Sequence, residues 1–466
     1  MSPDQSPRFT RRTALSMLGT VGAFAAAGCT APGARTNETN TSAGSEPKET
    51  APTEPPDDPP ADYDDWPDPP CTDCTVDFST PPAYDDDNWR MLGYDPGNSF
   101  VNPHADGPSD DPSVQWTFER NFLSMGASRF HHPLIVDGTV YTTQVIERLN
   151  RDQRGHWKFI AIDAATGEAE TVFEANSSIW RPTIANGIVY AAIGREVHAY
   201  DLETGCVCWK SEEILGAPSA IRRVGDVVVA TDSAFRRKLE TWEPVPQLHV
   251  LHAETGDKLW EAQGDNNGWD IPRMPIIDNE VVNFPNTKRR LDPPTGEELE
   301  PLPVRARYPV QTNGAYYGLT DIDDETVLTT YDWETGDHRW TYNPEGENVR
   351  AGWPVVIGDT VVVSETKGLV SGVDRTTGER LWRIEPWTHF DGVDSFLGSM
   401  FRVATSDTVY IVHDGGAVTA VDPTDGTIEW QLKTDEMNWT ATRGGCALAG
   451  DLLITVGEGG TLYAIS

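Results

Sequence analysis

The chain has 466 residues and carries 73 Asp and Glu against 36 Lys and Arg, a formal charge of −37. This balance excludes a nucleic-acid-binding protein, because phosphate recognition depends on clustered Lys and Arg. The acidic residues are spread along the chain and only 8 residues are Lys. We interpret the surface as halophilic, since hydrated carboxylates keep a protein soluble in concentrated salt. A cation-binding function of the whole surface is the alternative.

The first thirty residues are typical of an export signal. Arg11 and Arg12 precede an uncharged run, Thr13 to Gly28, that ends at Cys29. This pattern resembles a twin-arginine signal with a lipobox, whose Cys becomes the lipidated N-terminus. We therefore expect residues 1–29 to direct export and Cys29 to anchor the chain on the outer face of the cytoplasmic membrane. A transmembrane helix is the alternative, although the run is shorter than the roughly 20 apolar residues of a membrane span.

Residues 30–88 have the composition of a disordered tether. They include 12 Pro and 15 acidic residues, with few large apolar side chains. Such a segment buries too little apolar surface to offset the entropy of ordering its backbone.

Cysteine spacing predicts little chemistry. Cys71 and Cys74 form a C-x-x-C pair in the tether, where a local disulfide is favoured over a metal site that lacks two further ligands. Cys206 and Cys208 lie two apart on a predicted strand and share a face, so we interpret them as small buried residues. No metal site is expected.

From residue 89 onward a hairpin motif repeats. Alternating residues lead into a D-x-x-T-G-like turn, whose Asp can cap the turn and whose Gly can adopt positive φ, and a Trp-bearing strand usually follows. We expect this Trp to pack between adjacent sheets. The seven copies end at Phe173, Trp209, Trp260, Glu300, Trp340, Trp382 and Trp430.

A second series of turns precedes the first. Two hairpins per unit and a spacing of mostly about 40 residues predict four-stranded antiparallel blades. The eight units predict one all-β domain, an eight-bladed β-propeller over residues 89–466. The eight turns lie at Asp137-Gly138, Asn186-Gly187, Gly225-Asp226, Asp278-Asn279, Asn313-Gly314, Gly358-Asp359, Ser406-Asp407 and Gly450-Asp451.

The two ends of this region complement each other. The last unit stops at "TLYAIS" after its third strand, and "SVQWTFE" near residue 116 supplies a strand with Trp116 in the register of the motif Trp. Pairing of the N- and C-terminal strands would close the ring and remove its open edges. An open solenoid is the alternative.

These turns, with the segment "NWRMLGYDPGNSFVNPHADGP", resemble the pyrroloquinoline-quinone-like (PQQ-like) propeller repeat. That family includes quinoprotein alcohol dehydrogenases and the outer-membrane assembly lipoprotein BamB. The resemblance covers about residues 88–466 and implies the fold more strongly than an activity, because the motif Trp and Gly are structural.

The resemblance to quinoproteins implies an adjacent cysteine pair, a Ca²⁺ site and an Asp base. The sequence has no adjacent cysteines, no C-x-x-C-H haem motif and no long insertion to cover a bound quinone. The turns contain so many Asp residues that no catalytic base stands out. We therefore expect no catalytic residues, no cofactor and no metal, and we keep a PQQ-dependent oxidoreductase of alcohols or sugars as the alternative.

Arginines recur where the innermost strands begin in every unit except the third, an unusual pattern in so acidic a chain. Aromatic or imidazole groups accompany them. Such groups at one end of the central channel could bind a carboxylate or another anion. Pairing with acidic neighbours in adjacent blades is the other interpretation. The series comprises Arg129, Arg181, Arg273, Arg307, Arg350, Arg402 and Arg443. The candidate ligand-binding set is Arg181, Arg273, Arg307, Arg443, His131 and Trp353.

Two functions remain after this reading. The first is a non-catalytic, lipid-anchored extracytoplasmic propeller, monomeric, that binds a protein partner or a small anionic ligand. The second is the quinone-dependent enzyme. We expect the membrane to be contacted only through the lipid anchor.

Overall fold

The computed structural model describes the repeats and a stretch of chain before them. We describe residues 74, 78, 80–120, 132–148, 154–212, 218–232, 248–262, 276–277, 282–283, 288–302, 306–344, 348–349, 352–386, 399–413, 416–434, 445–457 and 460–466. Arg11, Arg12 and Cys29 lie outside these residues. Within them, no helix has the length and apolar character needed to cross a bilayer.

The described residues form eight four-stranded antiparallel sheets, which we number 1 to 8 along the chain. Sheets 1 to 4 contain β2 (Leu134–Val136), β3 (Thr139–Arg148), β4 (Arg154–Asp163) and β5 (Ala169–Ser177); β6 (Ile179–Ala185), β7 (Ile188–Ile193), β8 (Glu196–Asp201) and β9 (Cys206–Lys210); β10 (Pro218–Val224), β11 (Val227–Asp232), β12 (Leu248–His252) and β13 (Lys258–Ala262); and β14 (Ile276–Ile277), β15 (Val282–Asn283), β16 (Arg290–Leu291) and β17 (Glu298–Leu299).

The second half of the chain repeats this order. Sheets 5 to 8 contain β18 (Arg307–Thr312), β19 (Ala315–Ile322), β20 (Glu325–Asp332) and β21 (His338–Tyr342); β22 (Val355–Ile357), β23 (Thr360–Ser364), β24 (Val370–Asp374) and β25 (Arg380–Ile384); β26 (Ser399–Ala404), β27 (Val409–His413), β28 (Val418–Val421) and β29 (Ile428–Leu432); and β30 (Ala447–Ala449), β31 (Leu452–Val456), β32 (Leu462–Ile465) and β1 (Val114–Phe118). A short 3-10 helix, η3 (Thr366–Gly368), follows β23.

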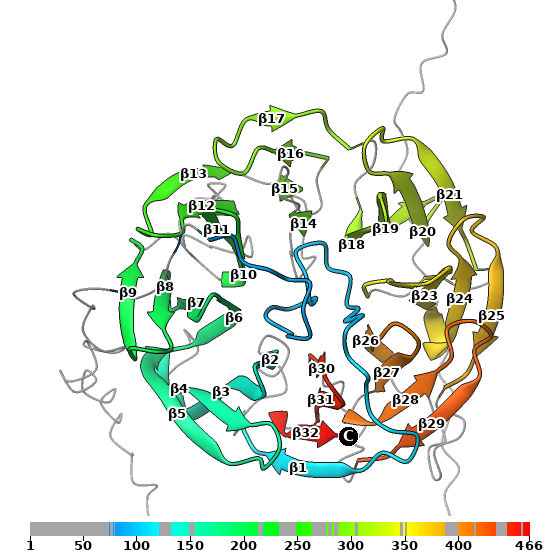
Figure 1. Ribbon diagram of the computed structural model, residues 1–466. Helices are drawn as coiled ribbons and strands as arrows, with labels where there is room; N and C mark the ends of the chain where they lie inside the picture. The colour runs from blue at the N-terminus through cyan, green and yellow to red at the C-terminus, as the bar shows by residue number, and fades with distance from the viewer. Residues whose placement is uncertain are drawn as a thin grey trace, which may run out of the picture. The chain divides into compact units, whose positions relative to one another are not determined.

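The sheets surround a common centre, with the first strand of each sheet innermost (Figure 1). This is a β-propeller built of four-stranded antiparallel sheets, as the two series of turns predict. The tight turns between first and second strands have left-handed residues where the sequence supplies Asn or Asp before Gly. Asn186 and Gly187, for example, have φ of 52° and 78°. Two successive positive φ values give the turn the twist that a two-residue hairpin needs.

The D-x-x-T-G turn joins the third and fourth strands of a sheet. In sheet 1 the Asp163 carboxylate accepts the backbone N–H of Ala165 at 3.1 Å and of Thr166 at 2.8 Å, and the Thr166 hydroxyl at 2.9 Å. Gly167 donates its N–H to the Asp163 carbonyl and has φ of +74°. The acidic turn is therefore a structural unit, since its Asp is bound to the turn itself.

The motif Trp joins neighbouring sheets, as predicted. Its indole lies against the turn Gly of the next sheet, where an added Cβ would come within 3 Å of the ring, and its Nε1–H donates to a backbone carbonyl of the same turn at 2.8–2.9 Å. The joint therefore requires Gly at the turn and Trp on the strand. The pairs are Trp116 with Gly167, Trp209 with Gly256, Trp260 with Gly296, Trp340 with Gly378, and Trp382 with Gly426.

The N-terminal strand lies in the same sheet as the C-terminal strands. β1 pairs antiparallel with β32, and Trp116 lies opposite Ala464. From there the Trp116 indole reaches sheet 1, where its Nε1–H donates to the Ala164 carbonyl at 2.9 Å. Sheet 8 thus contacts sheet 1 through the same Trp–Gly joint that links four other pairs of neighbouring sheets.

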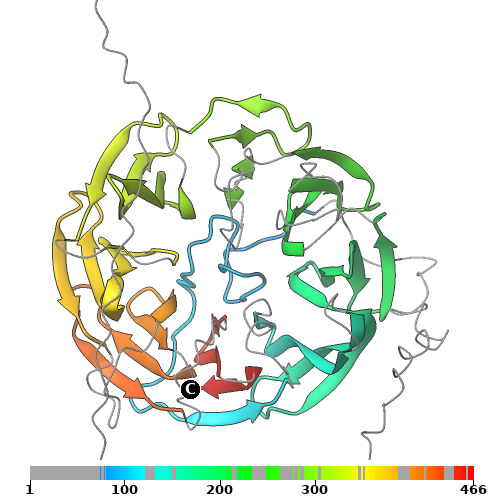
Figure 2. The same ribbon diagram turned by 180° about the vertical axis from the view of Figure 1, so that it is seen from behind.

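Residues 84–107, which we call the plug segment, cross the centre of the ring and appear blue in both views (Figures 1 and 2). Trp89, Leu92, Tyr94, Phe100 and Ala105 belong to the same buried apolar cluster as the inner strands of several sheets. The ring is therefore filled at its centre by chain from outside the repeats.

The tether predicted for residues 30–88 differs from the structure at its C-terminal end. The Tyr84 hydroxyl donates to the Arg223 carbonyl, and the carbonyls of Phe78 and Thr80 accept hydrogen bonds from Arg223 and Asn186 at 2.9 and 2.8 Å. Residues 80–88 accordingly belong with the propeller. The low apolar content of residues 30–88 does not predict this docking, because it depends on a few contacts, among them those of Phe78 and Tyr84.

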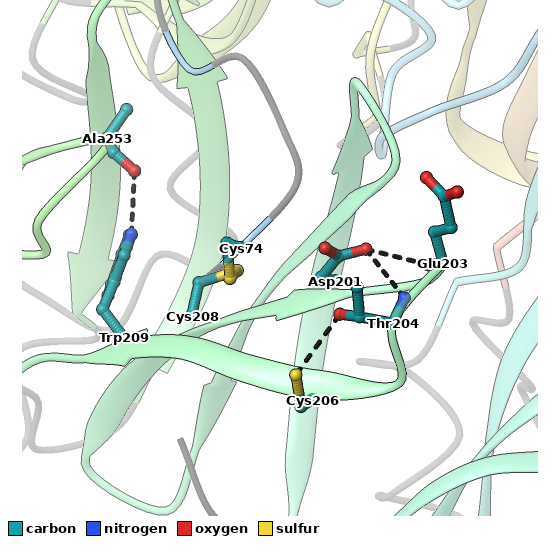
Figure 3. The surroundings of a disulfide bond; sticks show 8 residues. All are labelled: Cys74, Asp201, Glu203, Thr204, Cys206, Cys208, Trp209 and Ala253. Carbon is teal, nitrogen blue, oxygen red and sulfur yellow. Dashed lines mark hydrogen bonds between the residues drawn. A yellow bond between two sulfur atoms is a disulfide. The ribbon is translucent and has the colours of Figure 1, made fainter. Parts of the chain in front are cut away.

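The predicted local disulfide between Cys71 and Cys74 is wrong. Cys74 is bonded instead to Cys208 on β9, 134 residues away, with a Cα–Cα distance of 5.6 Å (Figure 3). Cys206 is also disulfide-bonded, so neither residue of the β9 pair is a simple packing residue. The spacing within C-x-x-C could not predict this, because docking of the N-terminal stretch brings Cys74 to the outer strand.

Candidate functional site

The candidate anion-binding set is only partly described. Arg273, Arg443 and His131 lie outside the described residues, as do Arg129 and Arg350 of the wider series. Arg181, Arg307 and Trp353 are described, and each makes different contacts. The structure therefore shows the surroundings of two arginines of the set and of Trp353.

Arg307 begins β18 and binds within its own sheet. Its Nη2 lies 2.5 Å from the Asp321 carboxylate at the end of β19 and 3.3 Å from the Thr326 hydroxyl on β20. The same hydroxyl donates to Asp321 at 2.8 Å. The guanidinium is thus committed to the loop between the second and third strands. The interpretation as structural pairing holds for Arg307, although the partner is in the same sheet and not in a neighbouring one.

Trp353 lies just before β22 and is 5% exposed. Its ring packs on Phe100 of the plug segment, with centroids 5.2 Å apart, and meets the Tyr308 ring edge-on at 5.1 Å. Its carbonyl accepts a hydrogen bond from Arg402 Nη2 at 2.6 Å. Trp353 therefore supports the plug segment, and its ring is buried between two other aromatic side chains.

Arg181 is buried, with 3% of its surface exposed. It precedes Pro182 on β6 and has φ of +28°, a conformation that L side chains rarely adopt. Burial, and secondarily the positive charge of Arg222, lower the pKa of the Arg181 guanidinium to about 9. A left-handed conformation of this kind persists only where the surrounding structure imposes it.

Arg222 on β10 is the functional residue of the centre that the sequence interpretation missed. Its Nη1 donates to the Asp95 carbonyl at 2.9 Å, and its Nη2 donates to the Leu92 carbonyl at 2.8 Å and to the Asn98 side-chain oxygen. Burial lowers the pKa of Arg222 to about 10, and the Asp95 carboxylate opposes that shift. A charged pair, Arg222-Arg223, within an otherwise apolar strand was the signal available in the sequence.

Arg402 completes a group of buried arginines. It lies on β26 and donates to the Ser364 hydroxyl and the Trp353 carbonyl, both on the neighbouring sheet 6. Both acceptors are neutral oxygens. Arg402 therefore braces two sheets, which is a structural role without an acidic partner.

Potential metal ligands gather at one place in the described part of the chain, beside β9. Cys74, Cys208 and the buried Asp201 carboxylate have ligand atoms within 4.8 Å of one another (Figure 3). The two sulfurs are bonded to each other, and Asp201 accepts the backbone N–H of Glu203 at 2.8 Å and of Thr204 at 3.3 Å. This cluster is a structural disulfide beside a capped turn.

The described aromatic side chains at the centre pack within the protein. Trp89, Phe100 and Trp353 are buried in one apolar cluster. The guanidinium groups of Arg222 and Arg402 are bound to backbone and side-chain oxygens of the chain. The described arrangement holds chain segments together.

Comparison with known proteins agrees with this architecture. The family model described as "Outer membrane protein assembly factor BamB" matches residues 109–291 and 285–466. BamB of Burkholderia pseudomallei is 22% identical over 268 residues, covering 53% of this chain and 68% of that protein. The serine/threonine-protein kinase AfsK of Streptomyces griseus is 23% identical over 251 residues, which are 46% of this chain and only 31% of the kinase.

Solved structures share the fold at low identity. BamB from Moraxella catarrhalis has a TM-score of 0.55 and 15% identity, covering 76% of this chain and all of that one. A quinohemoprotein alcohol dehydrogenase from Pseudomonas putida has a TM-score of 0.52 and 12% identity, covering 81% and 79%. Because the family model covers most of the chain, the protein belongs to the PQQ-like repeat family described as outer membrane protein assembly factor BamB.

Proposed function

We propose that this protein is an exported, lipid-anchored propeller that binds a protein partner and catalyses no reaction. Membership of a family described as an assembly factor supports a scaffold. The observation that carries the proposal is the engagement of the central residues by the chain itself, through Arg222, Arg402 and Trp353. Side chains that are buried and already bonded to the chain stabilise the fold. We therefore expect a protein partner to bind the outer surfaces and loops.

The proposed scaffold is a ring of eight blades closed by the pairing of β1 with β32. Eight four-stranded sheets among the described residues and the Trp116 joint to sheet 1 support this arrangement. Closure suits a scaffold, because it removes the two open sheet edges that would otherwise invite non-specific strand pairing.

A small anionic ligand is a second possible occupant, at Arg181 with Arg273, Arg443 and His131. Of these, Arg181 supports the idea through its burial and its strained backbone. Arg307 and Trp353 leave the proposed set, since the first pairs with Asp321 and the second packs on the plug segment.

Purification of the native protein from its membranes tests the function. We expect chemical cross-linking with mass spectrometry to recover the same protein partner repeatedly, and absorbance and mass spectra to show no quinone. A stoichiometric bound quinone together with dye-linked oxidation of an alcohol or sugar would overturn the proposal in favour of the enzyme.

Fractionation tests the anchor separately. Cys29→Ser should move the exported protein from the membrane to the soluble fraction, because buried acyl chains contribute about 0.8 kcal/mol per CH₂ and the acidic domain has little affinity for anionic lipid. A mutant that stays with membranes would show that a helix or a partner holds the chain there.

A further inference from the structure

The plug segment, residues 84–107, binds the inner strands of most sheets. Backbone hydrogen bonds join Trp89 to Ile135 of β2, at 2.7 and 3.0 Å, and Arg90 to Ile184 of β6, at 2.9 Å. On sheet 3 the contact is made by Arg222. One short segment thus bonds to three consecutive sheets before it turns.

The segment then contacts the other side of the ring. The Gly97 carbonyl accepts the Gln311 N–H of β18 at 2.8 Å, and Phe100 packs on Trp353 beside sheet 6. Asn102 donates its backbone N–H to Ala404 of β26 at 2.8 Å and its side-chain amide to Leu448 of β30 at 2.9 Å. With these bonds the plug segment reaches seven of the eight sheets.

These contacts concentrate at one end of the inner strands. Ala404 is the last residue of β26, and Gly450, whose carbonyl accepts the Gly107 N–H at 2.8 Å, lies in the turn after β30. Arg181 and Arg307 lie toward the opposite end, where the inner strands begin. The plug segment therefore covers the end formed by the short turns between the first and second strands.

The backbone of the plug segment is fixed in costly conformations. Tyr94, Asn98 and Phe100 have φ of 70°, 62° and 57°, in the left-handed region that a bulky residue such as Phe seldom adopts. Such conformations persist only where surrounding contacts impose them. The buried side chains of Asn98, Phe100 and Asn102, at most 1% exposed, supply those contacts. The segment is therefore shaped by the ring as a bound ligand is shaped by its receptor.

A covalent bond holds the chain upstream of this segment independently. The Cys74–Cys208 disulfide joins the N-terminal stretch to the outer strand β9, ten residues before Tyr84. The outer bond and the central contacts are thus two separate attachments of the same stretch to the propeller.

We propose that residues 84–107 are an intramolecular ligand that closes one end of the propeller, with Arg222 as its anchor. The Cys74–Cys208 bond is a second, covalent attachment of the same stretch to the propeller. This assignment does not depend on what the propeller binds, because it rests on contacts within the chain.

Cleavage of the full-length protein tests the proposal. A protease site inserted between the exposed residues Asp110 and Asp111 separates the plug segment from β1 without removing it. We expect the N-terminal piece to stay with the propeller on size-exclusion chromatography after cleavage, both before and after reduction of the disulfide. Release of the wild-type piece as soon as the disulfide is reduced would overturn the proposal.

Two variants test the anchor from opposite sides. Arg222→Met removes the donors from the ring, and Gly97→Ala places a Cβ 2.4 Å from the Gln311 carbonyl, acting from the plug segment alone. After cleavage and reduction, each should release the piece about tenfold faster or more. Arg222→Met loses charged hydrogen bonds, and Gly97→Ala forces the plug segment away from the Gln311 carbonyl. The matched control is Arg339→Met, whose guanidinium pairs with Asp332 at the outside of sheet 5 and which should behave as the wild type. If Gly97→Ala and the control release the piece equally slowly, the plug contacts do not hold it.

Discussion

Neighbouring sheets and the plug segment are attached to the propeller by different kinds of contact. Five joints between neighbouring sheets repeat one device, a Trp indole over a turn Gly, and the loss of one leaves four others of its kind. The plug segment is held by contacts that occur once, chiefly Arg222 and the left-handed Asn98 and Phe100. The propeller wall is therefore redundant, whereas its closed end depends on a few residues.

The largest effect should come from breaking the single anchor. Arg222→Met leaves the carbonyls of Leu92 and Asp95 and the Asn98 side chain without their buried donor. Each buried acceptor left without a hydrogen bond costs about 1 to 3 kcal/mol, so the loss of several should cost a few kcal/mol. Urea denaturation should show a loss of this size. Arg339→Met, at an exposed ion pair, should stay within about 1 kcal/mol of the wild type, and equal losses would show that Arg222 is not an anchor.

Breaking one joint between neighbouring sheets should lower the free energy of unfolding by less than the loss of Arg222. Gly167→Ala and Gly138→Ala lie in the same sheet and share φ of +74°, but only at Gly167 would the new Cβ meet an indole, 2.7 Å from Trp116. Both variants carry the penalty of a left-handed Ala, and overpacking adds about 1 to 3 kcal/mol at Gly167. Equal unfolding midpoints for the two would contradict the joint between sheets 8 and 1, and with it the closed ring.

Removing a single hydrogen bond from the propeller wall should lower the free energy of unfolding by still less. Trp340→Phe keeps an aromatic ring over Gly378 but loses the Nε1–H bond to the Arg375 carbonyl at 2.8 Å. A net loss of about 1 kcal/mol is expected for one hydrogen bond. Combined with Gly378→Ala the losses should be non-additive, because both act on one contact; strict additivity in a double-mutant cycle would mean that the two residues act separately.

The smallest expected effect is on the stability of the protein at acid pH. The Arg339 hydrogen bond, followed by the Thr335 N–H, lowers the pKa of the Asp332 carboxyl to about 2, below its ordinary value of 3.8. The folded state thus favours the ionised Asp332 carboxyl. Its contribution to the free energy of unfolding is present above about pH 4 and is lost as the pH falls toward 2. Asp332→Asn should flatten the pH dependence of unfolding in that window. An unchanged curve would show that this turn does not contribute to acid sensitivity.

The sequence predicted the parts of the fold that repeat. The register of Trp116 with the motif Trp, and the bound Asp of each D-x-x-T-G turn, follow from short local patterns that occur several times. The plug segment occurs once, and its binding depends on positions such as Arg222 that are more than 100 residues away. The partner of Cys74 was mispredicted for the same reason, since only the docked N-terminal stretch brings it to Cys208.

The candidate site was predictable to a smaller degree. Arginines at the starts of inner strands could be recognised, but a side chain of that length can point to its own sheet, to a neighbour or to the centre. Arg307 pairs with Asp321 in its own sheet, and Arg402 reaches sheet 6. Direction is set by packing around each residue, which the spacing of residues along the chain does not encode.

Hydrogen exchange of the unmodified protein, followed by mass spectrometry, tests the account most directly. The backbone N–H groups of Trp89, Asn102 and Gly107 are bonded to the Ile135, Ala404 and Gly450 carbonyls at 2.7–2.8 Å. The account predicts that peptides from residues 84–107 exchange as slowly as peptides from the inner strands, with and without reduction of the disulfide. Exchange of this segment within seconds, while the inner strands stay protected, would contradict a propeller closed by its own chain.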